Sequence, residues 1–87
     1  MMTETNHDRL KRLKMRSWRR GIKEMDMILG PYSDTELATL DETQIMLYDT
    51  LLSENDHDLY QWVTGQKPMP EEYLELLTGI SKFAFKS

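Results

Sequence analysis

Apolar side chains recur along the chain at intervals of three and four residues, the spacing that places them on one face of an α-helix. The pattern runs through five segments separated by brief polar connections, without an internal repeat. Strand-forming residues are scarce, since the chain has a single valine beside seven methionines. Methionine and other straight-chain residues favour helices, whereas β-branched residues favour strands. The sequence therefore predicts an all-α protein, a small compact five-helix bundle.

The first two segments differ in the strength of their apolar stripes. The first stripe consists of Leu10, Leu13 and Ser17. It is thin and predicts a peripheral helix over about residues 6–16. The second stripe consists of Ile22, Met25, Ile28, Leu29, Tyr32, Leu37 and Leu40. Gly30-Pro31 interrupts it, and a proline crowds the preceding helical turn. The stripe nevertheless keeps its phase, so we expect one kinked helix over about residues 21–39.

Residues that begin and end helices delimit the other three segments. Asp41, with a glutamine three residues later, has the spacing of a capping box. Asn55 or Asp56 caps the next helix, and Gly65 ends it. Pro70 opens the last helix, where two glutamates suit the positive end of the helix dipole. The expected core positions of these helices are Ile45, Tyr48, Leu51, Leu52, Leu59, Trp62, Val63, Tyr73, Leu76, Leu77, Ile80 and Phe83.

The length of 87 residues fits a single domain over residues 1–87. We expect residues 1–8 to form a frayed N-terminal tail and the helical bundle to extend over about residues 9–85. A chain of this size buries roughly 60% of its unfolded surface. That leaves room for a modest core but not for a deep, enclosed active site.

The chemical groups that many enzymes and metal sites need are missing from the sequence. There is no cysteine, which excludes thiolate zinc sites and cysteine nucleophiles. Neither His7 nor His57 has the partner spacing of a metal motif such as HExxH. No phosphate-binding loop, nucleophile elbow or paired-carboxylate motif is present. We therefore expect no catalytic residues, no metal site and no enzyme activity.

No apolar run approaches the ~20 residues that span a bilayer, and no secretory signal is present. We expect a soluble protein without membrane contact. Its expected location is the bacterial cytoplasm, or the mitochondrial matrix if it is a processed organelle form.

Charge is distributed unevenly along the chain. Residues 1–24 carry eight Lys or Arg against three Asp or Glu, whereas residues 25–87 carry three against twelve. The basic stretch RLKRLKMRSWRR, which contains Trp18, has the charge that phosphate contacts require. The acidic remainder would repel a polyanion, so we expect no nucleic-acid partner. A helical adaptor or nucleic-acid-associated protein that uses the basic first helix remains the alternative function.

Residues 19–26, RRGIKEMD, allow two interpretations. Arg20 and Glu24 are four residues apart, so they could form a surface ion pair on a helix, with Gly21 as the junction between helices. A glycine at a helix start costs about 0.5–1 kcal/mol relative to alanine. It could instead give another protein's backbone a flat, charged place for close approach. The residues by themselves favour neither interpretation.

Two blocks of sequence carry a resemblance to a known family. The first is the Arg-Gly-x-x-Glu motif of Arg20, Gly21 and Glu24. The second is QIMLYDTLLSENDHDLYQWVTGQKPMP, with Leu-Tyr-Asp, Leu-Tyr-x-Trp-x-Thr and Lys-Pro-x-Pro elements. Together they cover about residues 9–83. In this order and spacing they resemble the succinate dehydrogenase flavinylation, or FAD assembly, factors, called SdhE in bacteria, with mitochondrial relatives.

The resemblance implies a five-helix bundle that is not itself an enzyme. Such factors bind the flavoprotein subunit of succinate dehydrogenase, and in bacteria often that of fumarate reductase. They promote the covalent attachment of FAD to a histidine of that subunit. FAD then belongs to the partner, so we expect no cofactor in this chain, and we expect a monomer. The residues expected to bind the partner are Arg20, Gly21 and Glu24, with Arg19, Asp26 and Trp18 beside them.

The chain departs from the family pattern at two places. Several bacterial members carry an aromatic residue where this chain has Arg16, while Trp18 stands two residues later. Trp18 is therefore either a partner contact or a packing residue. Gly30-Pro31 replaces the apolar residues often found there and predicts a differently bent second helix.

Overall fold

Five α-helices and two short 3₁₀ turns make up the described part of the chain. The computed structural model describes residues 4–86, and this range contains no strand. The helices are α1 (Asn6–Ser17), α2 (Lys23–Glu36), α3 (Glu42–Leu51), α4 (Asp56–Val63) and α5 (Leu74–Ala84). The 3₁₀ turns are Leu37–Thr39 and Glu71–Tyr73. The predicted all-α, five-helix fold is confirmed.

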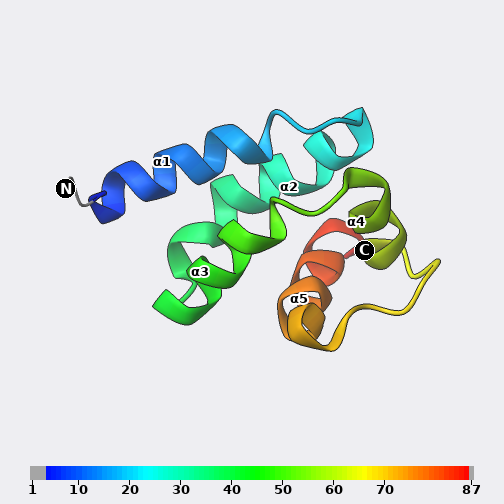
Figure 1. Ribbon diagram of the computed structural model, residues 1–87. Coiled ribbons are helices and arrows are strands. Elements are labelled where there is room, and N and C mark those ends of the chain that lie inside the picture. The colour runs from blue at the N-terminus through cyan, green and yellow to red at the C-terminus, as the bar shows by residue number, and fades with distance from the viewer. Residues whose placement is uncertain (1–3, 87) are drawn as a thin grey trace.

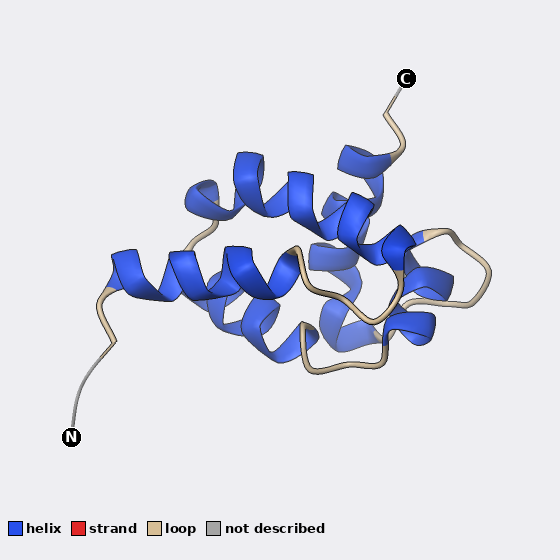
Figure 2. Ribbon diagram, turned by 90° about the horizontal axis from the view of Figure 1, so that it is seen from above, coloured by secondary structure: helices blue, strands red, loops and turns tan. Residues whose placement is uncertain are grey.

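The second helix lies at the centre of the arrangement. In Figure 1, α1 runs along the top and α2 returns beneath it toward α3, while α4 and α5 form the other end. α2 packs against α1, α4 and α5. Seen from above, the first turns of α1 project beyond the other helices (Figure 2), which fits the elongated extents of 41 × 25 × 25 Å.

One cluster of buried side chains connects all five helices. Its fully buried members include Leu13, Met25, Leu29, Leu37, Tyr48, Leu51, Leu59, Leu77 and Ile80. Two polar groups lie within it, because the Ser17 hydroxyl is 2.6 Å from the Tyr48 hydroxyl and donates to the Leu13 carbonyl. Burial raises the pKa of Tyr48 well above its ordinary value. The core therefore includes a satisfied hydrogen-bond pair that ties α1 to α3.

Helix ends follow the local signals in the sequence. Asp41 caps α3 by accepting from the Gln44 amide at 2.8 Å, and Asn55 caps α4 by accepting from the His57 amide at 2.8 Å. Gly65, with φ 81°, terminates α4. These caps confirm the predicted starts of α3 and α4 and the predicted end of α4. The last helix differs from the prediction, because a 3₁₀ turn over Glu71–Tyr73 follows Pro70 and α5 begins at Leu74.

The start of α1 differs from the expected frayed tail. The Thr5 hydroxyl accepts a hydrogen bond from the Asp8 amide at 3.1 Å, which caps the helix. Residues 6–8 therefore form the first turn of α1 and are not a tail. Residues 1–3 of the expected tail lie outside the described residues.

The glycine and proline inside α2 have separate explanations. The helix passes through Pro31 without a break, but it begins at Lys23, later than predicted, and ends at Glu36 before the 3₁₀ turn. Gly30 lies beneath the Trp18 ring, where an added Cβ would be 2.5 Å from Cε2 and 2.6 Å from Cε3. Only glycine leaves room for the indole at this position.

Alanine substitutions at two helical glycines should have opposite effects on stability. Gly30→Ala forces the Trp18 ring or α2 to move, so we expect a loss of roughly 1–3 kcal/mol. Gly79→Ala adds a Cβ with nothing within 4 Å and should stabilise α5 by about 0.5–1 kcal/mol. Urea unfolding followed by circular dichroism measures both. A Gly30→Ala variant as stable as the wild type would contradict the tight contact.

Candidate functional site

The motif residues lie in the connection between α1 and α2 and in the first turn of α2, where Glu24 stands. Trp18 is the C-cap of α1, and Ile22, with extended backbone, is the N-cap of α2. Gly21 therefore precedes the helix, which corrects the prediction of a helix starting at residue 21. Its φ is not positive, so backbone conformation does not explain the glycine.

Arg20 points inward and joins three helix ends. Its Nε donates to Asp56 Oδ1 at 2.7 Å, and its Nη2 donates to the Leu52 carbonyl at 2.9 Å. Its Nη1 lies 3.5 Å from the Arg16 carbonyl. The side chains of Arg20 and Asp56 are 7% and 15% exposed. The guanidinium therefore links the ends of α1 and α3 to the start of α4.

The Arg20–Glu24 ion pair, one of the two interpretations that the sequence left open, is not formed. The guanidinium of Arg20 instead forms an ion pair with Asp56, which lies 36 positions further along the chain. Asp56 lies in the first turn of α4, where a carboxylate is also favoured by the helix dipole. The four-residue spacing allows an ion pair with Glu24. The ion pair with Asp56 is more strongly shielded from water and is therefore stronger. In this position the guanidinium also donates to the Leu52 carbonyl.

The same carboxylate lies closely against Gly21. Its amide donates to Asp56 Oδ2 at 2.5 Å. A Cβ on residue 21 would lie 2.9 Å from that oxygen. The glycine thus permits Asp56 to approach the backbone, while the Gly21 residue itself stays exposed.

Asp26 fastens the other side of the connection. Its Oδ1 accepts from the Arg20 amide at 2.6 Å. Asp26 is half-buried and lies in the first turn of α2. Of the six expected partner-binding residues, Arg20 and Asp26 therefore make internal contacts that shape the loop.

Arg19 and Glu24 remain at the surface. Both are exposed, and neither side chain makes a hydrogen bond or ion pair with another residue of the described range 4–86. Trp18 combines internal contacts with partial exposure. Its ring covers Gly30 and its Nε1 donates to Asp34 at 3.2 Å, yet 43% of the residue is exposed.

Two open grooves flank the motif. The arginine groove, of about 500 Å³, is lined by Arg12, Met15, Arg16, Arg19, Arg20 and Asp56. The apolar groove, of about 490 Å³, is lined by Lys23, Glu24, Met27, Ile28, Tyr60 and Phe85. Arg19 belongs to the first and Glu24 to the second, so the exposed charges of the motif face different neighbourhoods.

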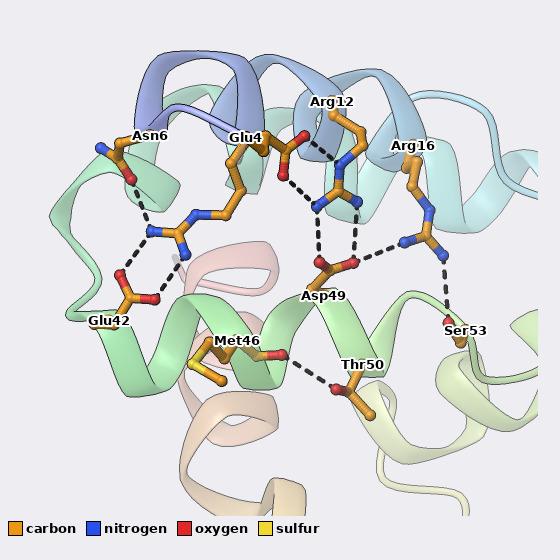
Figure 3. A network of polar contacts seen from close by, with 10 residues as sticks. Glu4, Asn6, Arg12, Arg16, Glu42, Met46, Asp49, Thr50 and Ser53 are labelled. Carbon is orange, nitrogen blue, oxygen red and sulfur yellow. Dashed lines mark hydrogen bonds and ion pairs between the residues drawn. The ribbon is translucent and has the colours of Figure 1, made fainter. Parts of the chain in front are cut away.

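The basic face of α1 is paired with acids of the same molecule (Figure 3). Arg9 makes a two-pronged contact with Glu42, with both distances 2.7 Å. Arg12 contacts both Glu4 and Asp49, and Arg16 contacts Asp49 at 2.9 Å. The Arg12 hydrogen bond is the main reason that the pKa of Asp49 lies below its ordinary value. Much of the basic charge is therefore neutralised internally.

Asp49 and Asp56 are the residues that sequence reasoning missed. The sequence offers Asp56 only as an alternative to Asn55 for the cap of α4. Because Asn55 caps the helix, the Asp56 carboxylate is free to contact Arg20. This is the only signal near Asp56 that points to its contact with Arg20. No sequence spacing identifies either aspartate as an ion-pair partner, because the arginines that they contact lie more than 30 positions away.

Other site types are not seen in the described residues. Over residues 4–86, no three His, Cys, Asp or Glu side chains are grouped as a metal ion would require. No helix in the same range has the length and apolarity needed to cross a membrane.

The fold and the site define a small helical protein in which the exposed charges of Arg19 and Glu24 lie beside two grooves. The chain belongs to the family described as "Flavinator of succinate dehydrogenase", which matches residues 11–84. The family resemblance stated from the sequence is thereby confirmed.

Relatives occur in animals and bacteria. The chain is 42% identical over 64 residues to "Succinate dehydrogenase assembly factor 2, mitochondrial" of Culex quinquefasciatus, covering 71% of this chain and 40% of the relative. It is 39% identical over 67 residues to the protein of that name in Drosophila grimshawi, covering 75% and 46%. It is 37% identical over 62 residues to "FAD assembly factor SdhE" of Legionella pneumophila strain Lens, covering 71% and 78%. The chain thus spans less than half the length of these mitochondrial relatives and most of the bacterial one.

Removing the Asp56 carboxylate should destabilise the fold strongly. Asp56→Ala leaves the guanidinium of Arg20 buried without its counter-ion, so we expect a loss of roughly 3 kcal/mol or more. The matched control is Glu42→Ala, which breaks an ion pair whose acid is 63% exposed and should cost less than about 1 kcal/mol. Urea unfolding of both variants at neutral pH gives the comparison. Equal losses would show that the Arg20–Asp56 pair has no special weight.

Acid should weaken the link between α1 and α3. The folded-state pKa of Asp49 is depressed, so its contribution is complete above the unfolded-state pKa and is lost as the pH falls below about 5. Asp49→Asn should therefore lower stability at pH 7 and make stability fall less between pH 5 and pH 3. The control is Glu71→Gln, an exposed acid without an ion pair within residues 4–86. Parallel pH profiles for wild type and Asp49→Asn would refute this.

Proposed function

We propose that this protein is an assembly factor that binds the flavoprotein subunit of succinate dehydrogenase and promotes the covalent attachment of FAD to it. The observation that carries the proposal is the family match over residues 11–84. The names of the bacterial and mitochondrial relatives describe assembly of the same enzyme and its FAD. Those names are of assembly factors, which supports a role in binding without catalysis by this chain.

The motif divides into residues that build the surface and residues that meet the partner. Arg20 is buried and holds the loop, so it acts as a positioning residue. Arg19 and Gly21 are exposed on that loop and Glu24 is exposed in the first turn of α2, and these three make the direct contacts. The opposite charges of Arg19 and Glu24 fix the orientation of the partner. Asp26 acts indirectly through its bond to the Arg20 amide, and Trp18 contributes its exposed edge.

The proposed mechanism is a shift of conformational population in the partner. The flavoprotein performs the bond-forming chemistry on its own FAD, and this protein binds better to the conformer in which the acceptor histidine faces the flavin. Only such a difference in affinity can move the equilibrium. A preformed, rigid loop suits this role, because little binding energy is lost in ordering it.

The proposal also covers a second partner, the oligomeric state and the cellular location of the protein. The flavoprotein of fumarate reductase is a further client, and the protein acts as a monomer and as one domain, since one core connects its five helices. It works where the flavoprotein matures, in the bacterial cytoplasm or in the mitochondrial matrix. Nucleic-acid binding is disfavoured, because Arg9, Arg12 and Arg16 are engaged by acids of the same molecule.

Glu24→Gln is the sharpest test of the proposal. Glu24 makes no ion pair or hydrogen bond within residues 4–86, so the variant should fold normally. We expect covalent flavin on the co-expressed flavoprotein to fall several-fold, or roughly tenfold for each 1.4 kcal/mol of lost interaction. In-gel flavin fluorescence under denaturing conditions measures it.

Gly21→Arg and Glu71→Gln complete the set. Gly21→Arg should abolish flavin attachment, because the new side chain displaces Asp56 and covers the surface. Glu71→Gln, a change at an exposed acid away from the motif, should leave attachment unchanged. If deletion of the whole protein leaves covalent flavin at its normal level, the proposed function is wrong.

A further inference from the structure

The apolar groove is built from three separate parts of the chain. Met27 and Ile28 come from α2, Tyr60 comes from α4, and Phe85 follows the end of α5. These three helices pack against one another in pairs. The groove is therefore a property of the assembled bundle and does not depend on one loop.

Large apolar side chains are exposed here without an internal reason. Met27 is 62% exposed and Phe85 is 57% exposed. Single exposed apolar residues are ordinary, whereas a group of them around a hollow marks an interaction site. By contrast Met46, which is 60% exposed, does not line either of the two grooves.

The groove is continuous with the motif. Lys23 and Glu24 line it together with the apolar residues, and Glu24 is three positions from the exposed Gly21. Charged residues beside an apolar floor give the composition of a protein–protein interface, with an apolar centre and a polar rim. A partner that contacts Glu24 therefore lies against this groove.

We propose that the apolar groove receives an apolar side chain of the flavoprotein subunit, presented beside a basic or hydrogen-bond-donating group that meets Glu24. The inference rests on the proposed function and names the contact that anchors it. Met27 suits such a site, because its flexible, polarisable side chain adapts to the shape of an incoming group. The charges of Glu24 and Arg19 set the register, and the groove supplies the larger share of the affinity.

Substitutions in the groove test this contact. Met27→Lys and Phe85→Ser each remove an apolar lining group from an exposed position, so the fold should persist, as circular dichroism and thermal unfolding will show. We expect each to weaken binding to the purified flavoprotein subunit roughly tenfold or more. Met27→Leu should bind nearly as the wild type does. Met46→Lys, the matched control on α3, should have no effect.

The outcomes separate this inference from the proposed function. If Met27→Lys and Phe85→Ser bind normally while Glu24→Gln binds weakly, the groove is not the anchor and the proposed function stands. If the groove variants change only the mass of the free protein in solution, the occupant is a second copy of this chain, and the inference is overturned. If the wild-type protein does not bind the flavoprotein, both proposals fail together.

Discussion

The structure of the motif depends on one carboxylate. Asp56 accepts from the Arg20 guanidinium through one oxygen and from the Gly21 amide through the other. The same guanidinium contacts the Leu52 carbonyl at the end of α3. Since both charged side chains are largely withdrawn from water, neither tolerates loss of the other. Three helix ends and the connecting loop are thereby held by one ion pair.

That constraint explains how a short connection holds its exposed residues in fixed positions. Arg20 and the Gly21 amide are directed inward, and as a result Arg19 and Glu24 are held outward on either side of an exposed glycine. Their backbone positions are set before any partner arrives, because Asp26 also fixes the Arg20 amide. A surface ordered in advance loses little conformational entropy on binding. The motif therefore places residues that hold the fold next to the exposed residues of the proposed binding surface.

Most of the fold is predictable because it depends on interactions between residues close in sequence. The site is only partly predictable because it depends on contacts between residues far apart in sequence. Helix type and ends followed from apolar spacing and from caps such as Asp41 and Gly65, whose effects act within one turn. The partner of Arg20 could not be predicted, because Asp56 becomes its neighbour only after α4 packs. The same holds for Trp18 and Gly30, whose contact across the α1–α2 pair explains a glycine that looked disruptive in the sequence.

The uneven distribution of charge along the chain contributes to the folded structure through internal ion pairs. The basic residues of α1 meet the acids of α3 and of its own N-terminal flank, so the charge asymmetry becomes attraction within the molecule (Figure 3). Within residues 4–86, Arg19, Lys23 and Glu24 remain near the motif without an ion pair, and an apolar groove lies beside them. Paired charges produce weak fields at a distance, so the internal ion pairs of α1 reduce the long-range attraction that its basic side chains would otherwise exert. In the proposed complex, close apolar contact in the groove therefore supplies most of the affinity, while Arg19 and Glu24 determine how the contact is aligned.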